Sequence, residues 1–524
     1  MATPERVDCR SMRGSCCPCG PGGNSSGCGI SRRGFLGGLG GTALGGWALS
    51  GLTWSGAAAA QAEGTVPPPR RTLVVKPILV YSTYTRLKQT SWRPWGGIQT
   101  QQDADQEMPR IQGEIDKMRA QADFPVTFLP VSGARKPADI ANLKDAATAD
   151  VIIIYAAGGG QDTLDAISNL GKNVIVFLRH RSGPVYLWYE IAHPIYLRRY
   201  KDHLGLKTVG YPDVVVDSTD EVVWRLRALC GLKDATGCRI VAIGGGSGWA
   251  MGQKAVDLAK DRFKLDIQSV SYDDLGKMIQ TAMADPSSVN LAKKRAEDYL
   301  KADGVKLETE KTFVENAFLL EQIFRSILAK AGCRAITINH CMSTIMPISQ
   351  TTACLSLSLL NDAGFMAFCE SDFVVIPSGL LMAGISGRPV FLNDPTYPHD
   401  GVITLAHCTA PRKMDGKNLD PVRLLTHFES DYGAAPKVEM RKGMKVTNII
   451  PDFLQERWVG LSGEIIDAPF MPICRSQIDI RFKADAEKFA EVMPGFHWMT
   501  CYGDYMKEIG YALGKTRVGW QNLG

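Results

Sequence analysis

The sequence predicts an α/β protein in which two doubly wound units with parallel sheets precede a β-rich, antiparallel domain. Three observations predict this class. Apolar, β-branched runs alternate with helical segments from Thr72 onward, a second strand–turn–helix–strand unit begins at Cys238, and short strands separated by turns follow Gly387. The 524 residues suffice for several domains of ordinary size.

The first unit opens with Leu73–Tyr81, an apolar run typical of a buried strand although Lys76-Pro77 interrupts it. The charged segment Asp103–Gln121 has helical character. Because strands that alternate with helices favour a parallel sheet, we expect one here. Further strands of this sheet are predicted at Val126–Val131, Ala149–Tyr155 and Asn173–Phe177.

The second unit follows a predicted helix, Asp217–Leu232. Residues 244–252 are rich in glycine and lie between a strand and a helix, where a dinucleotide would bind. No reading frame satisfies G-x-G-x-x-G, so a tight turn is favoured over NAD binding. The predicted strands are Cys238–Ile243, Leu265–Val270, Ala335–Asn339 and Met366–Phe368, and the predicted helices are Ala250–Phe263, Leu307–Lys330 and Thr352–Asp362.

The last unit is predicted to be antiparallel because its strands follow one another with few helices between them. These strands are Val390–Leu392, Val402–Ala406, Lys437–Met440, Lys445–Ile450, Trp458–Ile466 and Gln477–Phe482, and the helical segment Tyr505–Leu513 closes the chain. The predicted divisions are a leader at 1–62, a linker at 63–71, and domains at 72–205, 206–385 and 386–524.

The leader differs in composition from the rest, since it holds 15 of the 53 Gly and 5 of the 14 Cys. Ser31-Arg32-Arg33-Gly34-Phe35-Leu36 precedes an uncharged, Gly/Ala-rich run that ends at Ala60-Gln61-Ala62. This order indicates a twin-arginine signal peptide and export to a periplasmic or other extracytoplasmic location. The alternative, a membrane anchor, needs about 18 strongly apolar residues, so no stable membrane span is expected after cleavage.

Removing the leader takes away five basic and two acidic residues, which leaves a net charge of +2. No dense Lys/Arg run interleaved with aromatic residues follows, so nucleic-acid binding is not expected. The nine remaining cysteines are odd in number and irregular in spacing, which argues against a full disulfide framework.

Three potential metal ligands each follow an apolar run. Glu370 comes after Met366–Phe368 and Cys369, Asp394 comes after Val390–Leu392, and His407 comes after Val402–Ala406 and precedes Cys408. Two carboxylates with an imidazole suit a hard divalent cation, Mn²⁺ or Mg²⁺, better than a thiolate zinc site would. An alternative stays open: the acids cap neighbouring helices, and the histidine is a core residue whose hydrogen bonds are made within the protein.

The order of motifs resembles the L-fucose and L-arabinose isomerase superfamily, and most closely its fucose-isomerase-like branch. The resemblance spans most of residues 72–515. It rests on Trp92–Gly97, Trp188–Glu190, Thr352–Asp362, Cys369–Asp372, Gly387–Phe391 with Asp394-Pro395, His407-Cys408, and Pro494–Trp498 followed by Tyr502–Tyr505.

This resemblance implies two Rossmann-like α/β domains, a β-rich, barrel-like C-terminal domain, a homo-oligomer, and a metal site in the cleft between the second and third domains. Glu370 and Asp394 match metal-binding carboxylates that also serve as the acid/base pair. His497 matches the closing metal-binding histidine. His407 matches a histidine of the arabinose-isomerase branch, and whether it binds the metal here stays open.

Such a site interconverts an aldose and a ketose through an ene-diol, because a carboxylate removes the C–H proton while a divalent cation stabilises charge on O1 and O2. The predicted function is therefore a metal-dependent isomerase acting on a sugar or sugar derivative. Two alternatives stay open: an exported enzyme of this fold that carries out elimination or epimerisation on an oxidised sugar, and a sugar-binding protein without turnover. Phe496 stands before His497, where a polar residue of the family would contact the sugar.

Four further residues are candidates for substrate binding. By the resemblance, Trp92, Arg93 and Trp95 are expected to pack against a sugar bound to a neighbouring subunit, with core packing as the alternative. His340 follows a strand of the middle domain and is a candidate for the cleft wall, with a buried structural role as the alternative.

Overall fold

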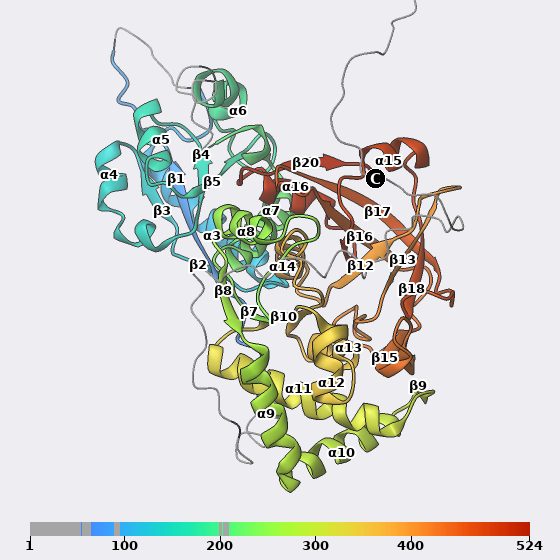
Figure 1. Ribbon diagram of the computed structural model, residues 1–524. Helices are drawn as coiled ribbons and strands as arrows, with labels where there is room; N and C mark the ends of the chain where they lie inside the picture. Colours follow the sequence, from blue (N-terminus) through green and yellow to red (C-terminus); the bar gives the residue numbers. More distant parts are fainter. Residues whose placement is uncertain (1–53, 55–63, 89–94, 199–201, 203–208) are drawn as a thin grey trace, which may run out of the picture. The chain divides into compact units, whose positions relative to one another are not determined.

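Figure 1 shows the computed structural model of the chain, which describes Trp54 and residues 64–88, 95–198, 202 and 209–524. The elements below all belong to one compact unit, Gly46–Gly524. The architecture is mixed α/β, with parallel sheets followed by an antiparallel barrel. The predicted leader lies outside the described residues except for Trp54, whose buried indole N–H donates a hydrogen bond to Ser288 Oγ (3.1 Å).

The first sheet is wholly parallel in the order β2-β1-β4-β5-β6, with β3 beside β1 beyond the end of β2. Its central strands are buried on both faces, which is typical of parallel sheets. The strands are β1 Leu73–Val80, β2 Val126–Phe128, β3 Ser132–Ala134, β4 Val151–Ala156, β5 Asn173–Leu178 and β6 Val214–Val216, and the helices are α3 Gln101–Gln121, α4 Pro137–Asn142, α5 Gln161–Ser168, α6 Trp188–Ile191 and α7 Thr219–Ala235.

The second sheet is also wholly parallel, in the order β11-β10-β7-β8. The predicted helix start at Ala250 is wrong. Helix α8 begins at Gln253 because Ala250 and Gly252 have φ of 57° and 52°, which a helix does not allow. The strands are β7 Arg239–Ile243, β8 Asp266–Val270, β10 Ala335–Ile338 and β11 Met366–Phe368, and the helices are α8 Gln253–Phe263, α9 Tyr272–Ala284, α10 Pro286–Leu300, α11 Lys311–Ala331, α12 Met346–Ser349, α13 Ala353–Asp362 and α14 Ile376–Ser386.

The C-terminal strands, orange to red in Figure 1, form a closed antiparallel ring in the order β16-β19-β12-β13-β18-β17 and back to β16. Strand β20 adds to β17 in parallel. The strands are β12 Phe391–Pro395, β13 Val402–His407, β16 Lys445–Pro451, β17 Arg457–Asp467, β18 Ser476–Arg481, β19 Trp498–Tyr502 and β20 Gly519–Asn522, and the helices are α15 Ala486–Val492 and α16 Met506–Leu513.

A small third sheet joins β9 Val305–Leu307, β14 Val422–His427 and β15 Tyr432–Val438. The pairing of β9 with β14 connects the segment before α11 to the C-terminal part of the chain. The predicted helix start at Leu307 is therefore wrong, since that residue ends a strand and α11 begins at Lys311. None of the described helices combines the length and the apolarity needed to span a bilayer.

Candidate metal centre

Glu370 lies in a turn at the carboxyl end of β11, where Glu370 and Ser371 have φ of 63° and 46°. Residues other than glycine rarely adopt this left-handed conformation, so neighbouring structure must hold it. The glycine loop does so. Ser247 N–H donates to Ser371 O (3.1 Å), and Phe373 N–H donates to Ser247 O (2.9 Å).

The barrel supplies the other three predicted ligands. Asp394 lies on β12, His407 ends β13, and His497 directly precedes β19. Strand β12 pairs with both β13 and β19. Asp394 pairs with Ala406, the residue before His407. Asn393 pairs with Trp498, the first residue of β19, so the next position along these antiparallel strands places His497 beside Asp394. Adjacent strands thus gather residues that are far apart in the sequence.

The four side chains converge. His497 Nε2 lies 3.3 Å from Glu370 Oε2 and 3.1 Å from Asp394 Oδ1, and His407 Nε2 lies 3.6 Å from Glu370 Oε1. Both imidazoles are buried, and within the described part of the chain their Nε2 atoms have no hydrogen-bond partner. The Glu370 side chain is 34% exposed, so a small molecule can reach the cluster. A buried imidazole nitrogen that has no hydrogen bond and faces carboxylates is typical of a residue that binds a cation.

Electrostatics keep both carboxylates ionised. Burial by itself would raise the pKa of Glu370, but the neighbouring imidazoles of His407 and His497 hold it well below its ordinary value. Burial would raise the pKa of Asp394 too, and His497 lowers it. Burial would lower the pKa of His497, yet Asp394, with Asp372 and Glu370, raises it well above its ordinary value. The cluster therefore favours a positive charge at its centre, which a cation can supply in place of a proton.

Among the residues that the structure describes, two groups of three side chains could hold a metal ion: Cys369 with Glu370 and His407, and Asp394 with His407 and His497. In each group the ligand atoms lie within 4.8 Å of one another. Cys369 is less suitable, because a thiol contact with Cys341 raises its pKa well above the ordinary value and disfavours the thiolate. Two carboxylates and two imidazoles remain, a donor set that accepts Mn²⁺ or another hard divalent cation.

A third carboxylate, to which the sequence assigned no role, contacts this cluster. Asp372 Oδ2 lies 2.6 Å from His497 Nδ1, and both side chains are buried. The only signal in the sequence was the place of Asp372 in the motif Cys369-Glu370-Ser371-Asp372. Its partner lies 125 residues further along, so no local pattern could reveal the contact.

Of the four predicted substrate-binding residues, the structure describes Trp95 and His340, and it brings neither of these two into the cluster. Trp92 and Arg93 lie outside the described residues. Trp95 is 69% exposed and so is not a core residue. His340 is exposed at the carboxyl end of β10, with φ of 48°, so the alternative of a buried role is wrong. The contacts of the described residues join neither Trp95 nor His340 to the four ligands.

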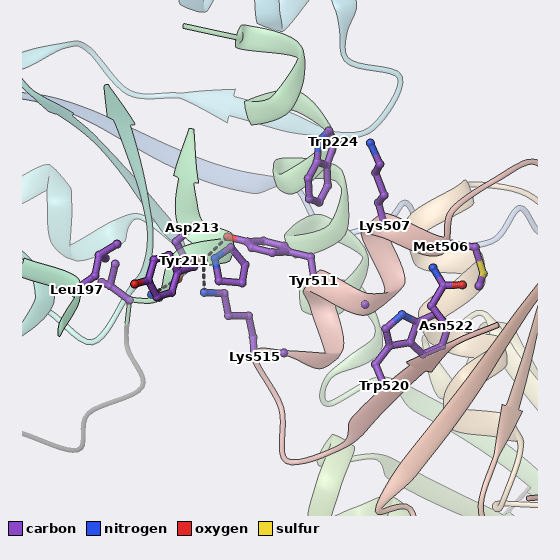
Figure 2. Close-up of a pocket in the computed structure, with 15 residues that line it drawn as sticks. Leu197, Tyr211, Asp213, Trp224, Met506, Lys507, Tyr511, Lys515, Trp520 and Asn522 are labelled. Carbon is purple, nitrogen blue, oxygen red and sulfur yellow. Dashed lines mark hydrogen bonds and ion pairs between the residues drawn. The ribbon is translucent and has the colours of Figure 1, made fainter. Parts of the chain in front are cut away.

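A cavity of about 600 Å³ shares no lining residue with the metal ligands (Figure 2). Aromatic and basic side chains line it, among them Trp224, Tyr511, Trp520 and Lys515. Its one carboxylate, Asp213, accepts hydrogen bonds from Tyr511 Oη (2.7 Å) and Lys515 Nζ (2.5 Å). Because Asp213 is already paired and the lining contains no second acid, the cavity lacks the paired carboxylates of the cluster.

Comparison of the chain with models of protein families gave no match, and comparison with curated proteins gave none either. The arrangement of residues itself therefore carries the functional argument.

Proposed function

We infer that the protein is a metal-dependent aldose–ketose isomerase that acts on a sugar or sugar derivative by an ene-diol mechanism. One observation carries this proposal: two ionised carboxylates, Glu370 and Asp394, lie within 3.3 Å and 3.1 Å of the same imidazole nitrogen of His497. Moving a proton between adjacent carbons requires one group that removes it and another that manages the hydroxyl protons. Two carboxylates close to the same nitrogen can divide these two roles between them.

Glu370, Asp394, His497 and His407 would hold the cation, Mn²⁺ or another divalent ion such as Mg²⁺. When bound, it supplies electrostatic stabilisation for the negative charge that develops on the substrate oxygens. Glu370 is the more accessible carboxylate, with 34% of its side chain exposed against 13% for Asp394. We assign to Glu370 removal of the C–H proton, and to Asp394 the transfer of the hydroxyl proton.

The remaining parts of the proposal follow the motif resemblance. We propose that the two α/β units are Rossmann-like domains and that the protein is a homo-oligomer. Trp92, Arg93 and Trp95 would then meet the sugar in a neighbouring subunit's site. The twin-arginine leader would send the protein to the periplasm or another extracytoplasmic location, and the cation would be loaded before export because that route carries folded proteins.

The test is a screen of unmodified aldoses and ketoses with the full chain, with and without Mn²⁺, followed by NMR. Isomerisation conserves the molecular formula and moves the carbonyl, whereas elimination releases water. We expect Mn²⁺-dependent isomerisation that Glu370→Gln abolishes without loss of the folded state. A product that lacks water, or full activity in Glu370→Gln, would overturn the assignment, and sugar binding without any product would favour a binding protein.

A further inference from the structure

We propose that Asp372, held by the glycine loop, is a positioning residue that fixes the tautomer of His497 so that Nε2 is free to bind the cation. This inference rests on the proposed function, since it concerns one ligand of the proposed metal site. It gives the glycine-rich segment, residues 244–252, a role other than phosphate binding: the segment aligns a carboxylate behind a metal ligand.

The contact determines which ring nitrogen carries hydrogen. An ionised carboxylate only accepts hydrogen bonds. With Asp372 Oδ2 at 2.6 Å from His497 Nδ1, that nitrogen must donate, so in the neutral imidazole that a bound cation requires, Nε2 presents a lone pair toward Glu370 and Asp394. The side chains of Asp372 and His497 are 3% and 1% exposed, so water does not compete for the contact. A carboxylate behind a ligating histidine fixes ring orientation and raises ligand basicity.

The loop fixes the carboxylate in turn. Asp372 Oδ1 accepts hydrogen bonds from the backbone N–H groups of Trp249 and Val374, both at 3.0 Å. The Trp249 ring stacks on Phe496, with centroids 4.6 Å apart, and meets the His497 ring edge-on at 6.1 Å. The Trp249 segment thus contacts both members of the carboxylate–imidazole pair.

Glycine is required where the loop passes Asp372. A Cβ on Gly248 would lie 2.2 Å from Ala255 Cβ, a distance that packing does not permit, and 3.5 Å from Asp372 Oδ1. Any larger residue at position 248 would push the Trp249 N–H away from the carboxylate. The glycine at position 248 is therefore explained by its close packing against Ala255 of α8, at the point where the loop passes Asp372.

The substitution Asp372→Asn distinguishes positioning from support of the loop. The backbone donors Trp249 N–H and Val374 N–H require an acceptor at the Oδ1 position, so the amide oxygen must take it. The amide NH₂ then faces His497 Nδ1 and donates to it, which moves the ring hydrogen to Nε2 and blocks the cation. An Asp-to-Asn change that traps the wrong tautomer of a partner histidine is known from the serine protease triad.

The substitution Asp372→Ala tests support of the loop rather than positioning of the imidazole. It removes the acceptor of two loop N–H groups and weakens the fold, but it leaves His497 free to adopt either tautomer. If Asp372 positions the imidazole, Asn lowers cation affinity more than Ala does. If Asp372 only supports the loop, Ala is the more damaging change in both affinity and melting temperature.

The experiment measures Mn²⁺ affinity of the full chain by calorimetry and by the EPR signal of free Mn²⁺. It also reads the His497 tautomer in the metal-free protein from imidazole ¹⁵N shifts, at a pH above the raised pKa of that residue, where the ring is neutral. The matched control is Asp452→Asn, because Asp452 also accepts two backbone N–H bonds, from Glu456 (2.8 Å) and Arg457 (3.0 Å), but has no hydrogen bond or ion pair with a histidine in the described part of the chain. We expect wild type and control to agree, and Asp372→Asn to lose about 10- to 100-fold in affinity with hydrogen on His497 Nε2.

Equal affinity of Asp372→Asn and wild type, hydrogen retained on Nδ1 in that variant, or weaker binding by Asp372→Ala than by Asp372→Asn would overturn the positioning role. The proposed function fails separately: wild type would then bind no Mn²⁺, or His497→Gln would bind it as well as wild type. The ¹⁵N measurement needs no metal, so it decides the role of Asp372 in that case too.

Discussion

His407 and His497 differ in what holds their rings. His497 has a carboxylate behind Nδ1, whereas His407 Nδ1 lies 3.3 Å from the Thr409 hydroxyl. A hydroxyl can donate or accept, so it does not impose a tautomer. His407 is also farther from Glu370, at 3.6 Å. It is therefore the weaker of the two nitrogen ligands in the proposed site.

Replacing each histidine in turn tests this difference. We expect His407→Gln to lower Mn²⁺ affinity about tenfold, a loss in the range seen when a metal site's supporting partners are removed. His497→Gln should lower it much more, because it removes the ligand nearest both carboxylates. Calorimetric titration of both variants gives the two losses. Equal losses, or a greater loss in His407→Gln, would contradict the ranking.

Asp362, at the end of α13, predicts a pH effect on stability. Burial raises its pKa to about 7, although hydrogen bonds and charges near Arg412 and Lys413 act in the other direction. The folded state therefore binds a proton more readily than the unfolded state between about pH 4 and pH 7. Stability contributed by the protonated form is complete below the unfolded pKa and is lost as pH rises through the folded one, by at most about 4 kcal/mol.

Asp362→Asn should remove this loss, because an amide stays neutral and its oxygen can still accept the Lys413 N–H bond (2.8 Å). The expected result is a melting temperature that falls less between pH 5 and pH 7.5 than in wild type, measured by calorimetry. The control is Asp303→Asn at an exposed position. Parallel pH profiles for wild type and Asp362→Asn would rule out the assignment.

At the residue scale, Glu370, Asp394 and His407 were singled out because each follows an apolar run, and His497 was singled out by the motif resemblance. The structure brings these four together. The Asp372–His497 contact could not be predicted, since it depends on a turn with two left-handed residues. Substrate residues were harder still: His340 stands at the expected sheet edge, but its side chain is exposed.

At the scale of elements, helices α7 and α14 approach each other closely through glycine. A Cβ on Gly231 of α7 would lie 2.7 Å from the backbone nitrogen of Ile385 in α14, and one on Gly384 would lie 2.9 Å from Gly231 O. Every residue of α14 except its last, Ser386, is buried. This close crossing ties the first helix after the N-terminal sheet to the segment between Glu370 and Asp394.

Gly231→Ala should therefore destabilise the protein. Alanine improves helix propensity by up to about 1 kcal/mol, but overpacking costs about 1–3 kcal/mol, so we expect a lower melting temperature. The matched control is Gly276→Ala in α9, where a Cβ would meet no atom within 4 Å and alanine should stabilise. An increase in melting temperature for both variants would show that the α7–α14 contact can relax.

Prediction of the elements succeeded where periodicity is clear and failed where it is absent. The buried strands β1, β4, β5 and β7 lie within a few residues of their predicted ranges. Helix α14 was missed because it is apolar on all sides and has no amphipathic pattern. Strand β19 was missed because its residues Trp498–Tyr502 are all buried and do not alternate.

At the scale of the whole molecule, the candidate ligands come from two different parts of the fold. Glu370 follows β11 of the second parallel sheet, while Asp394, His407 and His497 belong to the barrel. A cation held by all four would connect the two. Ligands that bind only the folded state stabilise it, by about 2.7 kcal/mol at one hundred times the dissociation constant.

Removing the cation with a chelator should therefore lower the melting temperature of the purified protein, and added Mn²⁺ should restore it. The same treatment of Glu370→Gln should give a smaller difference, because one of the oxygen ligands loses its charge. Differential scanning calorimetry of wild type and variant, each untreated, chelated and restored with Mn²⁺, gives the comparison. Identical melting curves with and without chelator in wild type would exclude a cation that links the sheet to the barrel.

The closed ring of strands also determines when the site can form during synthesis. Strand β12, which carries Asp394, needs β19 as its neighbour, and β19 pairs with it only after more than one hundred further residues have been made. Glu370 and Asp372 therefore leave the ribosome long before His497 can reach them. A ribosome-bound chain truncated before His497 has an incomplete set of ligands, so the cation can be acquired only at the end of translation or later.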